Sequence, residues 1–254
     1  MPASPPAPGP ESASELAPGT APGVRARVRE EMTRQIVAAA RRHLATEGAA
    51  GLSLRAVARD LGMASSAVYR YVSSRDELLT LLIVDAYDAL GEAVERDEAE
   101  VPRDELTDRY LAICSAARSW ALRSPHEFAL IFGTPVPGYA APEATVGPAA
   151  RVGGVLIDLL ADAVAAGVAA PGAQPLTDTA VQAIAPIRPV FPETVPDELV
   201  FAGIVVWTHL IGSISLELFG HRHNVVADAP ALRAAFQLQE MTLLARRLGI
   251  LPPR

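Results

Sequence analysis

The stretch from 52 to 79, LSLRAVARDLGMASSAVYRYVSSRDELL, constrains the fold of this chain more than any other. Its first half has apolar residues at i, i+3, i+4 and i+7, namely Leu54, Val57, Ala58 and Leu61. This spacing predicts a two-turn helix with Ser53 as its N-cap. Gly62 predicts the helix end, because glycine tolerates a left-handed backbone, and Ser65 is expected to cap a second helix. Two helices joined by so short a turn cross steeply, which is helix-turn-helix geometry.

The second helix is expected over Ser65 to Val72, with Val68 and Val72 on its inner face. The other side chains face outward and are small, aromatic or cationic: Ser66, Ala67, Tyr69, Arg70 and Tyr71. Small residues permit close approach, and the aromatics and the Arg suit contact with the major groove of DNA. The plainer alternative is that exposed Tyr and Arg side chains on a surface helix have no partner.

Three segments of this region resemble, position by position, the DNA-binding domain of the tetracycline-repressor-like (TetR/AcrR) family of bacterial regulators. They are IVAAARRHLATEGAAGLSLRAVARDLGM, SSAVYRYV and SSRDELL. The resemblance implies that Tyr69 and Arg75 contact phosphates and that Ser66, Ala67, Arg70 and Tyr71 lie nearest the bases. The candidate DNA-binding residues are Ser53, Arg55, Ser65, Ser66, Ala67, Tyr69, Arg70, Tyr71 and Arg75.

Positive charge is concentrated around this unit. Residues 24–83 carry ten Arg against six acidic residues, whereas the whole chain has a formal net charge of −7. The acidic remainder is repelled by the phosphate backbone, so the DNA-contacting surface is expected on the N-terminal unit. Arg25, Arg27 and Arg29 form a candidate basic arm for phosphate or the minor groove. The alternative is a solvated run of Arg at a helix start.

The chain divides into three parts. Residues 1–23 are rich in Pro and Ala without apolar periodicity, which predicts a disordered tail and no secretory signal. Residues 24–90 are expected to form the helix-turn-helix domain, with a supporting helix over 24–47 and a long helix leaving it at Arg75. Residues 91–254 are expected to form a ligand-binding and dimerisation domain.

Apolar periodicity in the last part predicts further helices. Their expected ranges are 104–122, a short helix from 124, 152–166, 199–216 and 228–248. Six prolines between 167 and 196 exclude a long helix there, apart from a turn or two near 177–184. The predicted fold class is all-α, with an N-terminal three-helix helix-turn-helix domain followed by a C-terminal helical bundle.

The stretch 199–216 contains no charged residue, which makes a membrane span one interpretation. We reject it because His209 lies near its centre, Glu198 and Glu217 flank it, and no Arg cluster marks a cytoplasmic side. A helix that is apolar all round is otherwise buried on two sides, here by its own domain and by a second subunit. With the last helix it predicts a homodimer interface, as in the resembling family: Gly212, Leu238, Met241, Ala245 and Leu248.

Two segments, FALIFGTPVPGYAAP and WTHLIGSISLELFGH, resemble the C-terminal domain of the WHG-type branch of the same family. That branch often has His before the glycine at 212, where this chain has Ile211. The resemblance and the aromatic residues predict a pocket for a largely apolar small molecule, although ordinary core packing is the alternative for each residue. The candidate ligand-binding residues are Trp120, Phe128, Phe132, Trp207, Thr208 and His209.

Other chemistry is sparse. The single cysteine, Cys114, excludes an internal disulfide framework and fits a reducing, cytoplasmic location. Glu217 and His221 are spaced i, i+4 without a third ligand at helical spacing, so no metal or cofactor is predicted. The sequence lacks a Ser/His/Asp order and a Gly-rich phosphate loop, which argues against an enzyme.

The sequence as a whole predicts a homodimeric transcriptional regulator. It is expected to be a repressor that an unknown small effector releases from a palindromic double-stranded DNA operator, without membrane association. A non-allosteric architectural DNA-binding protein is the first alternative. A metal-dependent enzyme on a helical scaffold is the second.

Overall fold

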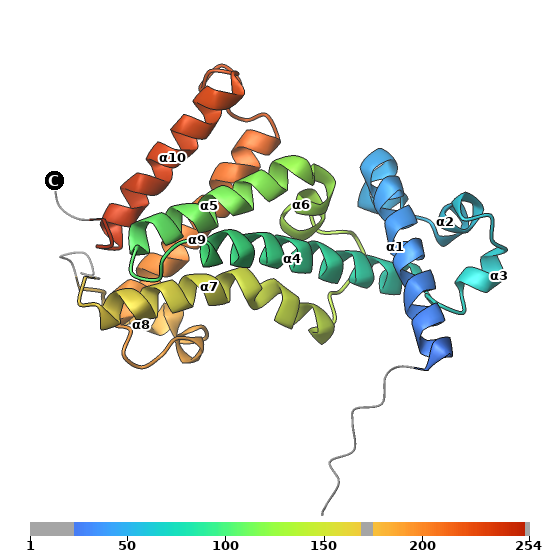
Figure 1. Cartoon of the computed structure of the whole chain (residues 1–254), viewed down its shortest axis with the longest axis horizontal. Coiled ribbons are helices and arrows are strands. Elements are labelled where there is room, and N and C mark those ends of the chain that lie inside the picture. Colours follow the sequence, from blue (N-terminus) through green and yellow to red (C-terminus); the bar gives the residue numbers. More distant parts are fainter. Residues whose placement is uncertain (1–22, 169–174, 252–254) are drawn as a thin grey trace, which may run out of the picture.

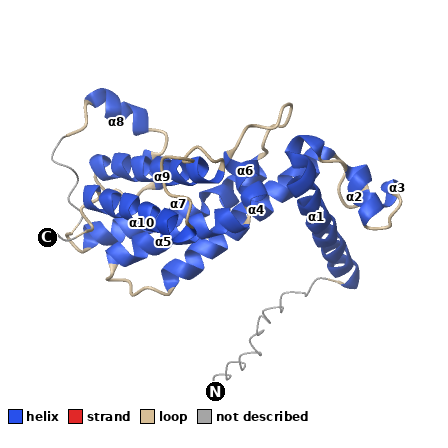
Figure 2. Ribbon diagram, turned by 90° about the horizontal axis from the view of Figure 1, so that it is seen from above, coloured by secondary structure: helices blue, strands red, loops and turns tan. Residues whose placement is uncertain are grey.

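The computed structural model describes residues 23–168 and 175–251, and every regular element within these ranges is a helix (Figures 1 and 2). The all-α prediction is therefore confirmed, whereas the predicted disordered tail lies almost wholly outside the described residues. The helices are α1 Val24–Gly51, α2 Leu54–Asp60, α3 Ser65–Val68, α4 Arg75–Ala99, α5 Leu106–Arg123, α6 Pro125–Phe132, η1 Glu143–Thr145, α7 Val146–Ala165, α8 Asp178–Ile184, η2 Arg188–Val190, α9 Asp197–Leu218 and α10 Pro230–Arg247.

The first three helices and the start of α4 share one apolar core, and they form a separate unit at one end of α4 (Figure 1). Its buried residues are Ile36, Ala39, Ala40, Leu52, Leu54, Val57, Ala58, Val68, Val72, Leu78, Leu79 and Leu82. Burial of one such Ile or Leu side chain stabilises the fold by about 1.5–3 kcal/mol. The apolar faces of α1 and α2 thus lie where their periodicity predicted.

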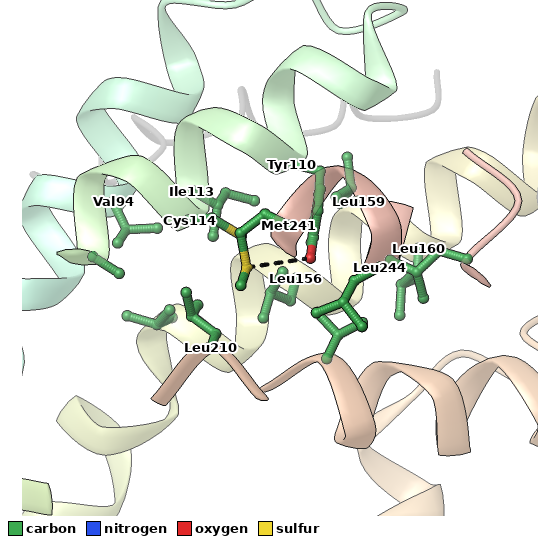
Figure 3. Close-up of a cluster of buried hydrophobic side chains, with 14 of the residues drawn as sticks. Val94, Tyr110, Ile113, Cys114, Leu156, Leu159, Leu160, Leu210, Met241 and Leu244 are labelled. Carbon is green, nitrogen blue, oxygen red and sulfur yellow. Dashed lines mark hydrogen bonds between the residues drawn. The ribbon is translucent and has the colours of Figure 1, made fainter. Parts of the chain in front are cut away.

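A second core is built by α5, α7, α9 and α10 around the rest of α4. Tyr110 lies in its middle and donates its hydroxyl to the Met241 sulfur at 3.8 Å (Figure 3). Cys114 lies beside them, and burial raises the pKa of its thiol to about 12, so it remains a neutral apolar residue. The two cores meet within α4, between Leu82 and Ala86.

Buried ion pairs fasten the helices of the second core. Arg109 is 2% exposed and donates to Glu98 at 2.6 Å and to Asp162 at 2.8 Å. Arg118 on α5 holds Glu217 on α9 through both carboxylate oxygens, at 2.5 and 2.7 Å. Two-point Arg–carboxylate pairing of this kind fixes the relative register of the helices that carry the partners.

Two helices, 143–165 and 197–218, are long and apolar enough to cross a membrane by length and composition. Core helices of soluble proteins pass the same test. In α9, the polar side chains have partners from the same domain, since Ser213 donates to Glu240 at 2.8 Å and Glu217 binds Arg118. These contacts fit a helix packed inside a helical bundle.

Several helix boundaries differ from the sequence-based expectations. The first helix was expected to end at residue 47, but α1 runs to Gly51 with a break at Gly48, whose φ is +68°. The second helix of the motif ends at Val68, not at Val72, and the chain continues from there in tight turns. Ala64, not Ser65, occupies its N-cap position, so the Ser65 cap was wrong. The helix expected from 152 begins at Val146, because a proline such as Pro148 is tolerated within a first helical turn.

Candidate DNA-binding surface and effector cavity

The turn between α2 and α3 is fixed by one glycine and two valines. Gly62 has φ +64°, a left-handed conformation that other residues adopt at a cost, and the Met63 amide donates to the Ala58 carbonyl at 2.9 Å. Val57 and Val68 are buried and hold the two helices together. The predicted helix-turn-helix is therefore present, with a shorter second helix.

The predicted DNA-binding residues all belong to the unit formed by α1, α2, α3 and the start of α4, at one end of the molecule (Figure 2). The exposed ones are Arg55, Ser66, Tyr69 and Arg70, and Tyr69 has 47% of its surface free. The partly buried ones are Ser53, Ser65, Ala67, Tyr71 and Arg75. A set with small residues, aromatics and one exposed guanidinium on the second helix and its following turn matches the chemistry of groove contact.

Arg75 has a different environment from the rest of the set. Its Nη2 donates to the carbonyls of Ala49 and Ala50 at 2.9 and 3.2 Å, and its Nε donates to Leu52 at 3.2 Å. These carbonyls belong to the end of α1, where the helix leaves its last acceptors unsatisfied. Arg75 therefore caps α1, and a phosphate contact by the same side chain remains a prediction.

A pair of serines that are not among the predicted site residues fixes the start of α4. They follow the turn at residues 69–71, after α3, which we call the recognition turn. Ser74 Oγ accepts from the Glu77 amide at 3.0 Å, and Glu77 Oε2 accepts from the amide and hydroxyl of Ser73, each at 2.6 Å. The hydrogen bonds from Ser73 lower the pKa of the Glu77 carboxyl. The spacing of Ser74 and Glu77 is that of a capping box, which is a signal readable in sequence.

The six predicted ligand-binding residues do not converge on one cavity. Trp120 and Phe128 are buried in the core at 5% and 1% exposure, and Thr208 and His209 are exposed on the outer side of α9. His209 lies 3.5 Å from Glu240 of α10. The predicted pocket is corrected accordingly: because α9 is apolar on every side, its periodicity carries no information about which residues point inward.

The remaining two, Phe132 and Trp207, belong to an aromatic cluster. Their ring centroids are 6.1 Å apart, and Phe128 lies 5.0 Å from Phe132. Tilted and edge-to-face aromatic contacts at these distances stabilise a core beyond simple burial. Three of the predicted residues therefore pack against one another at the junction of α6 and α9.

A cavity of about 430 Å³ lies between α7 and α9, next to η2. Its lining residues are Ala149, Gly153, Leu156, Ile157, Leu160, Ile187, Phe191, Gly203, Ile204 and Trp207. None of these side chains is charged, and Trp207 is the one residue shared with the predicted set. A side chain at Gly153 would meet no atom within 4 Å, so this glycine leaves space open. Such a cavity suits a neutral apolar molecule.

The predicted dimer seam is corrected in part. Met241, Ala245 and Leu248 are each at most 1% exposed and point into the core of their own protomer, as Figure 3 shows for Met241. The opposite face of α10 is exposed and apolar, with Leu232, Phe236 and Leu243. The choice of face was wrong because both sides of the helix carry apolar residues at helical spacing.

Large apolar side chains are also exposed on α9. Phe201 and Leu216 are 39% and 46% exposed, and a Cβ at Gly212 would meet no atom within 4 Å. Of the predicted seam residues, Gly212 and Leu238 remain accessible, since Leu238 is 52% exposed. A single protomer thus leaves large apolar side chains exposed on both of its last two helices.

The pair Glu217 and His221 has no features of a metal site. Both carboxylate oxygens of Glu217 bind Arg118, and His221 is exposed. Among the described residues, no group of three or more His, Cys, Asp or Glu side chains is placed to hold a metal ion.

The two cores are joined by a junction of α1, α4 and α6. Arg41 on α1 pairs with Asp85 on α4, and its Nε lies 3.9 Å from Glu127 on α6. Burial raises the pKa of Asp85, and the nearby carboxylates Asp88 and Glu127 act in the same direction against Arg41. The segment after α6 also reaches α4, where Tyr139 and Thr80 are hydrogen-bonded at 2.9 Å.

Two family models match the chain. The model described as bacterial regulatory proteins, tetR family, matches residues 36–82, and the model described as tetracyclin repressor-like, C-terminal domain, matches residues 110–241. HTH-type transcriptional regulators of Mycobacterium tuberculosis (Rv1816) and Mycobacterium bovis (Mb1846) are 47% identical to this chain over 222 residues. Each alignment covers 85% of this chain and 92% of the relative. The chain belongs to the TetR family.

Solved structures have the same fold. The regulatory protein SCO4313 aligns with a TM-score of 0.68 and 31% identity, over 85% of this chain and 97% of that chain. The TetR family transcriptional regulator PfmR from Thermus thermophilus aligns with a TM-score of 0.54 over 84% of this chain and 98% of that chain. Its identity of 19% supports the fold alone.

Membership in the TetR family makes this chain a DNA-binding transcriptional regulator. The family resemblance inferred from the N-terminal motif is confirmed, and the relatives are regulators, not enzymes. TetR regulators bind DNA operators, dimerise and carry a ligand-binding C-terminal domain. The assignment to the WHG-type branch remains a prediction.

Proposed function

We propose that this TetR regulator is a cytoplasmic homodimeric repressor that a small apolar effector releases from a palindromic operator. One observation carries the proposal: the same chain has exposed small, aromatic and cationic side chains on and after α2 and α3, suited to groove contact, and, in the other core, a cavity lined only by uncharged residues. The helix α4 belongs to both cores. We divide the chain into a DNA-binding domain, 24–90, and an effector and dimerisation domain, 91–254.

Roles within the DNA-binding surface follow from side-chain chemistry. Arg70 is exposed and can donate a fork to guanine O6 and N7, and the exposed Tyr69 would contact phosphate. Ser66 and Ala67 are small enough to bring the backbone close to the base edges. Ser53 and Arg55 flank the start of α2 and would contact the backbone of the duplex.

Dimerisation would use the exposed apolar surface of α9 and α10. Phe201, Gly212 and Leu216 lie at helical spacing along α9, and Leu232 and Leu243 lie on the open side of α10. A twofold axis through this surface makes the operator a near-palindrome. The two recognition units would then enter successive major grooves, about 34–36 Å apart.

The effector would occupy the cavity beside Trp207. An effector changes DNA affinity only if it binds two conformations of the dimer with different affinity. The junction of Arg41, Asp85 and Glu127 ties α1 to α4 and α6, so a shift in the second core reaches the DNA-binding domain there. A coupling of about 1–3 kcal/mol changes operator affinity by roughly 5–150-fold.

The experiment that tests the DNA-binding assignment is selection of duplexes from a random pool by the purified full-length protein. We expect a near-palindromic sequence to be enriched. Arg70→Ala should then lose about 1–3 kcal/mol on that duplex and relax the preference at one position in each half-site. Equal losses on the selected duplex and on random DNA would contradict base contact by Arg70.

The architectural alternative is separated from the repressor by the effector. An architectural protein would bind the selected duplex with the same affinity whether or not an apolar ligand occupies the cavity. A repressor would bind it more weakly with the ligand present. A reporter gene behind the selected operator distinguishes repression from activation, because deletion of the regulator raises expression only in the first case.

A further inference from the structure

Arg29 lies on α1 but contacts the recognition unit. The second helix of the motif ends at Val68, and the next residues turn so tightly that the Val68 carbonyl accepts from the amides of Tyr71 and Val72, at 2.9 and 3.0 Å. The carbonyl of Arg70 accepts instead from Nη1 of Arg29, at 2.9 Å. A side chain 41 residues earlier in the chain thus supplies a hydrogen-bond donor to the turn that carries Arg70.

Two further interactions hold the same guanidinium in place. Its central carbon lies 5.8 Å from the centroid of the Tyr71 ring, within the range of a cation–π contact. Its charge also acts on Glu77 at the start of α4, where hydrogen bonds from Ser73 lower the carboxyl pKa and the field of Arg29 adds to that shift. The Arg29 side chain therefore links α1 to the recognition turn and to the start of α4.

We propose that Arg29 is a positioning residue, which fixes the orientation of Arg70 and Tyr71 toward the bases and does not act as part of a phosphate-binding arm. The proposal rests on the base-contacting roles proposed above for Arg70 and Tyr71. Its physical basis is the shortness of the recognition helix. The amides of Tyr69 and Arg70 donate back to the carbonyls of Ser65 and Ala67, but the Arg70 carbonyl lies beyond the end of this short helix and takes its donor from Arg29. The clamp from α1 thus holds the outer end of the turn.

The matched control is Arg25. It lies one helical turn before Arg29 on α1, it is exposed, and its replacement removes the same charge from the same part of the domain. If either Arg bound a phosphate, replacing it with Ala would weaken binding to every sequence and reduce the salt slope by about 0.9. Removal of a clamp would instead weaken binding to the selected duplex only.

The binding test compares R29A, R29K and R25A in the full-length protein, on the duplex that the wild-type protein selects and on random duplex, at several salt concentrations. For R29A we expect the ratio of the two affinities to fall by about 5–150-fold, the range of one base contact, with an unchanged salt slope. R29K should restore part of this ratio, because an ammonium group can donate to the Arg70 carbonyl, and R25A should leave it unchanged. Equal weakening on both duplexes with a flatter salt slope would overturn the clamp in favour of the arm.

A second measurement needs no DNA. Hydrogen exchange should be faster at the amides of Tyr71 and Val72 in R29A than in the wild type, while protection in the buried part of α1 stays the same. R25A should exchange like the wild type at both places. Unchanged exchange at 71 and 72 in R29A would overturn the proposal even if a DNA target were never found. If the exchange difference were present but the wild type selected no duplex, the result would count against the proposed DNA roles alone.

Discussion

Arg75 is the predicted site residue whose expected role changes most once its hydrogen bonds are known. The family resemblance implies that it contacts phosphate, but two of its nitrogens donate to three carbonyls at the end of α1. Hydrogen bonds from a charged group contribute about 1.5–3 kcal/mol. We therefore expect Arg75→Ala to lower the free energy of unfolding by roughly that amount, as measured by urea denaturation of the full-length protein.

Arg75→Lys is the matched comparison for this substitution. A lysine ammonium keeps the charge but cannot span three carbonyls with a planar fork, so it should recover only part of the stability. A phosphate role predicts another pattern, in which stability is unchanged and the salt slope of DNA binding becomes flatter in Arg75→Ala but not in Arg75→Lys. That pattern would contradict the capping role.

The sequence predicted which side chains are buried only where a helix has apolar residues on a single face. Ile36, Ala40 and Leu44 were placed correctly because α1 has a single apolar stripe and a charged opposite face. The cap of α3 was misplaced because Ala64, which has no side-chain acceptor, takes that position. The orientation of Thr208 and His209 was not predictable, since the residues around them are apolar in every direction.

At the scale of elements, α10 has two apolar faces with different roles. Met241 is 1% exposed and contacts Tyr110, whereas Leu243 is 52% exposed on the proposed dimer surface. Met241→Arg should therefore prevent folding, because a charge without a partner is buried. Leu243→Arg should give a folded monomer, because the charge falls between two protomers. Circular dichroism reports folding, and light scattering reports mass.

The two substitutions place the same side chain on one helix, so the comparison isolates the face. Dimers of unchanged mass from Leu243→Arg would mean that the protomers associate elsewhere. A folded monomer from Met241→Arg would instead restore the seam that the sequence suggested. The sequence alone could establish that α9 and α10 are core and interface helices, but only the packing of Met241, Ala245 and Leu248 shows which face is which.

At the scale of the whole molecule, Asp85 links the two cores and makes stability depend on pH. Burial, aided by nearby carboxylates, raises its pKa in the folded state, so folding favours the protonated form. Its contribution to stability is then present below the unfolded pKa of about 3.9 and is lost as pH rises through the raised folded value. We expect Asp85→Asn to remove this loss, so the variant gains stability relative to the wild type as pH increases.

The measurement is the difference in unfolding free energy between Asp85→Asn and the wild type as a function of pH. Asp158→Asn, an exposed carboxylate on α7, is the control and should show no such gain. If the wild type gained stability over Asp85→Asn as pH rose, the pairing with Arg41 would outweigh burial, and the sign of the shift would be wrong.

Communication between the two ends of the molecule is the last property to test. Trp207 lines the cavity and Trp120 does not, so an apolar ligand in the cavity should change the fluorescence of the wild type and of Trp120→Phe, but not of Trp207→Phe. Gly153→Leu should abolish the change, because a side chain there enters open space in the lining.

In the same titration, operator affinity should fall by about 5–150-fold, and by less in Glu127→Gln, which weakens the ion-pair contact between α6 and α1. Because a ligand cannot shift an equilibrium unless it distinguishes the two states, quenching of Trp207 with unchanged operator affinity would leave a pocket without allostery and favour an architectural role.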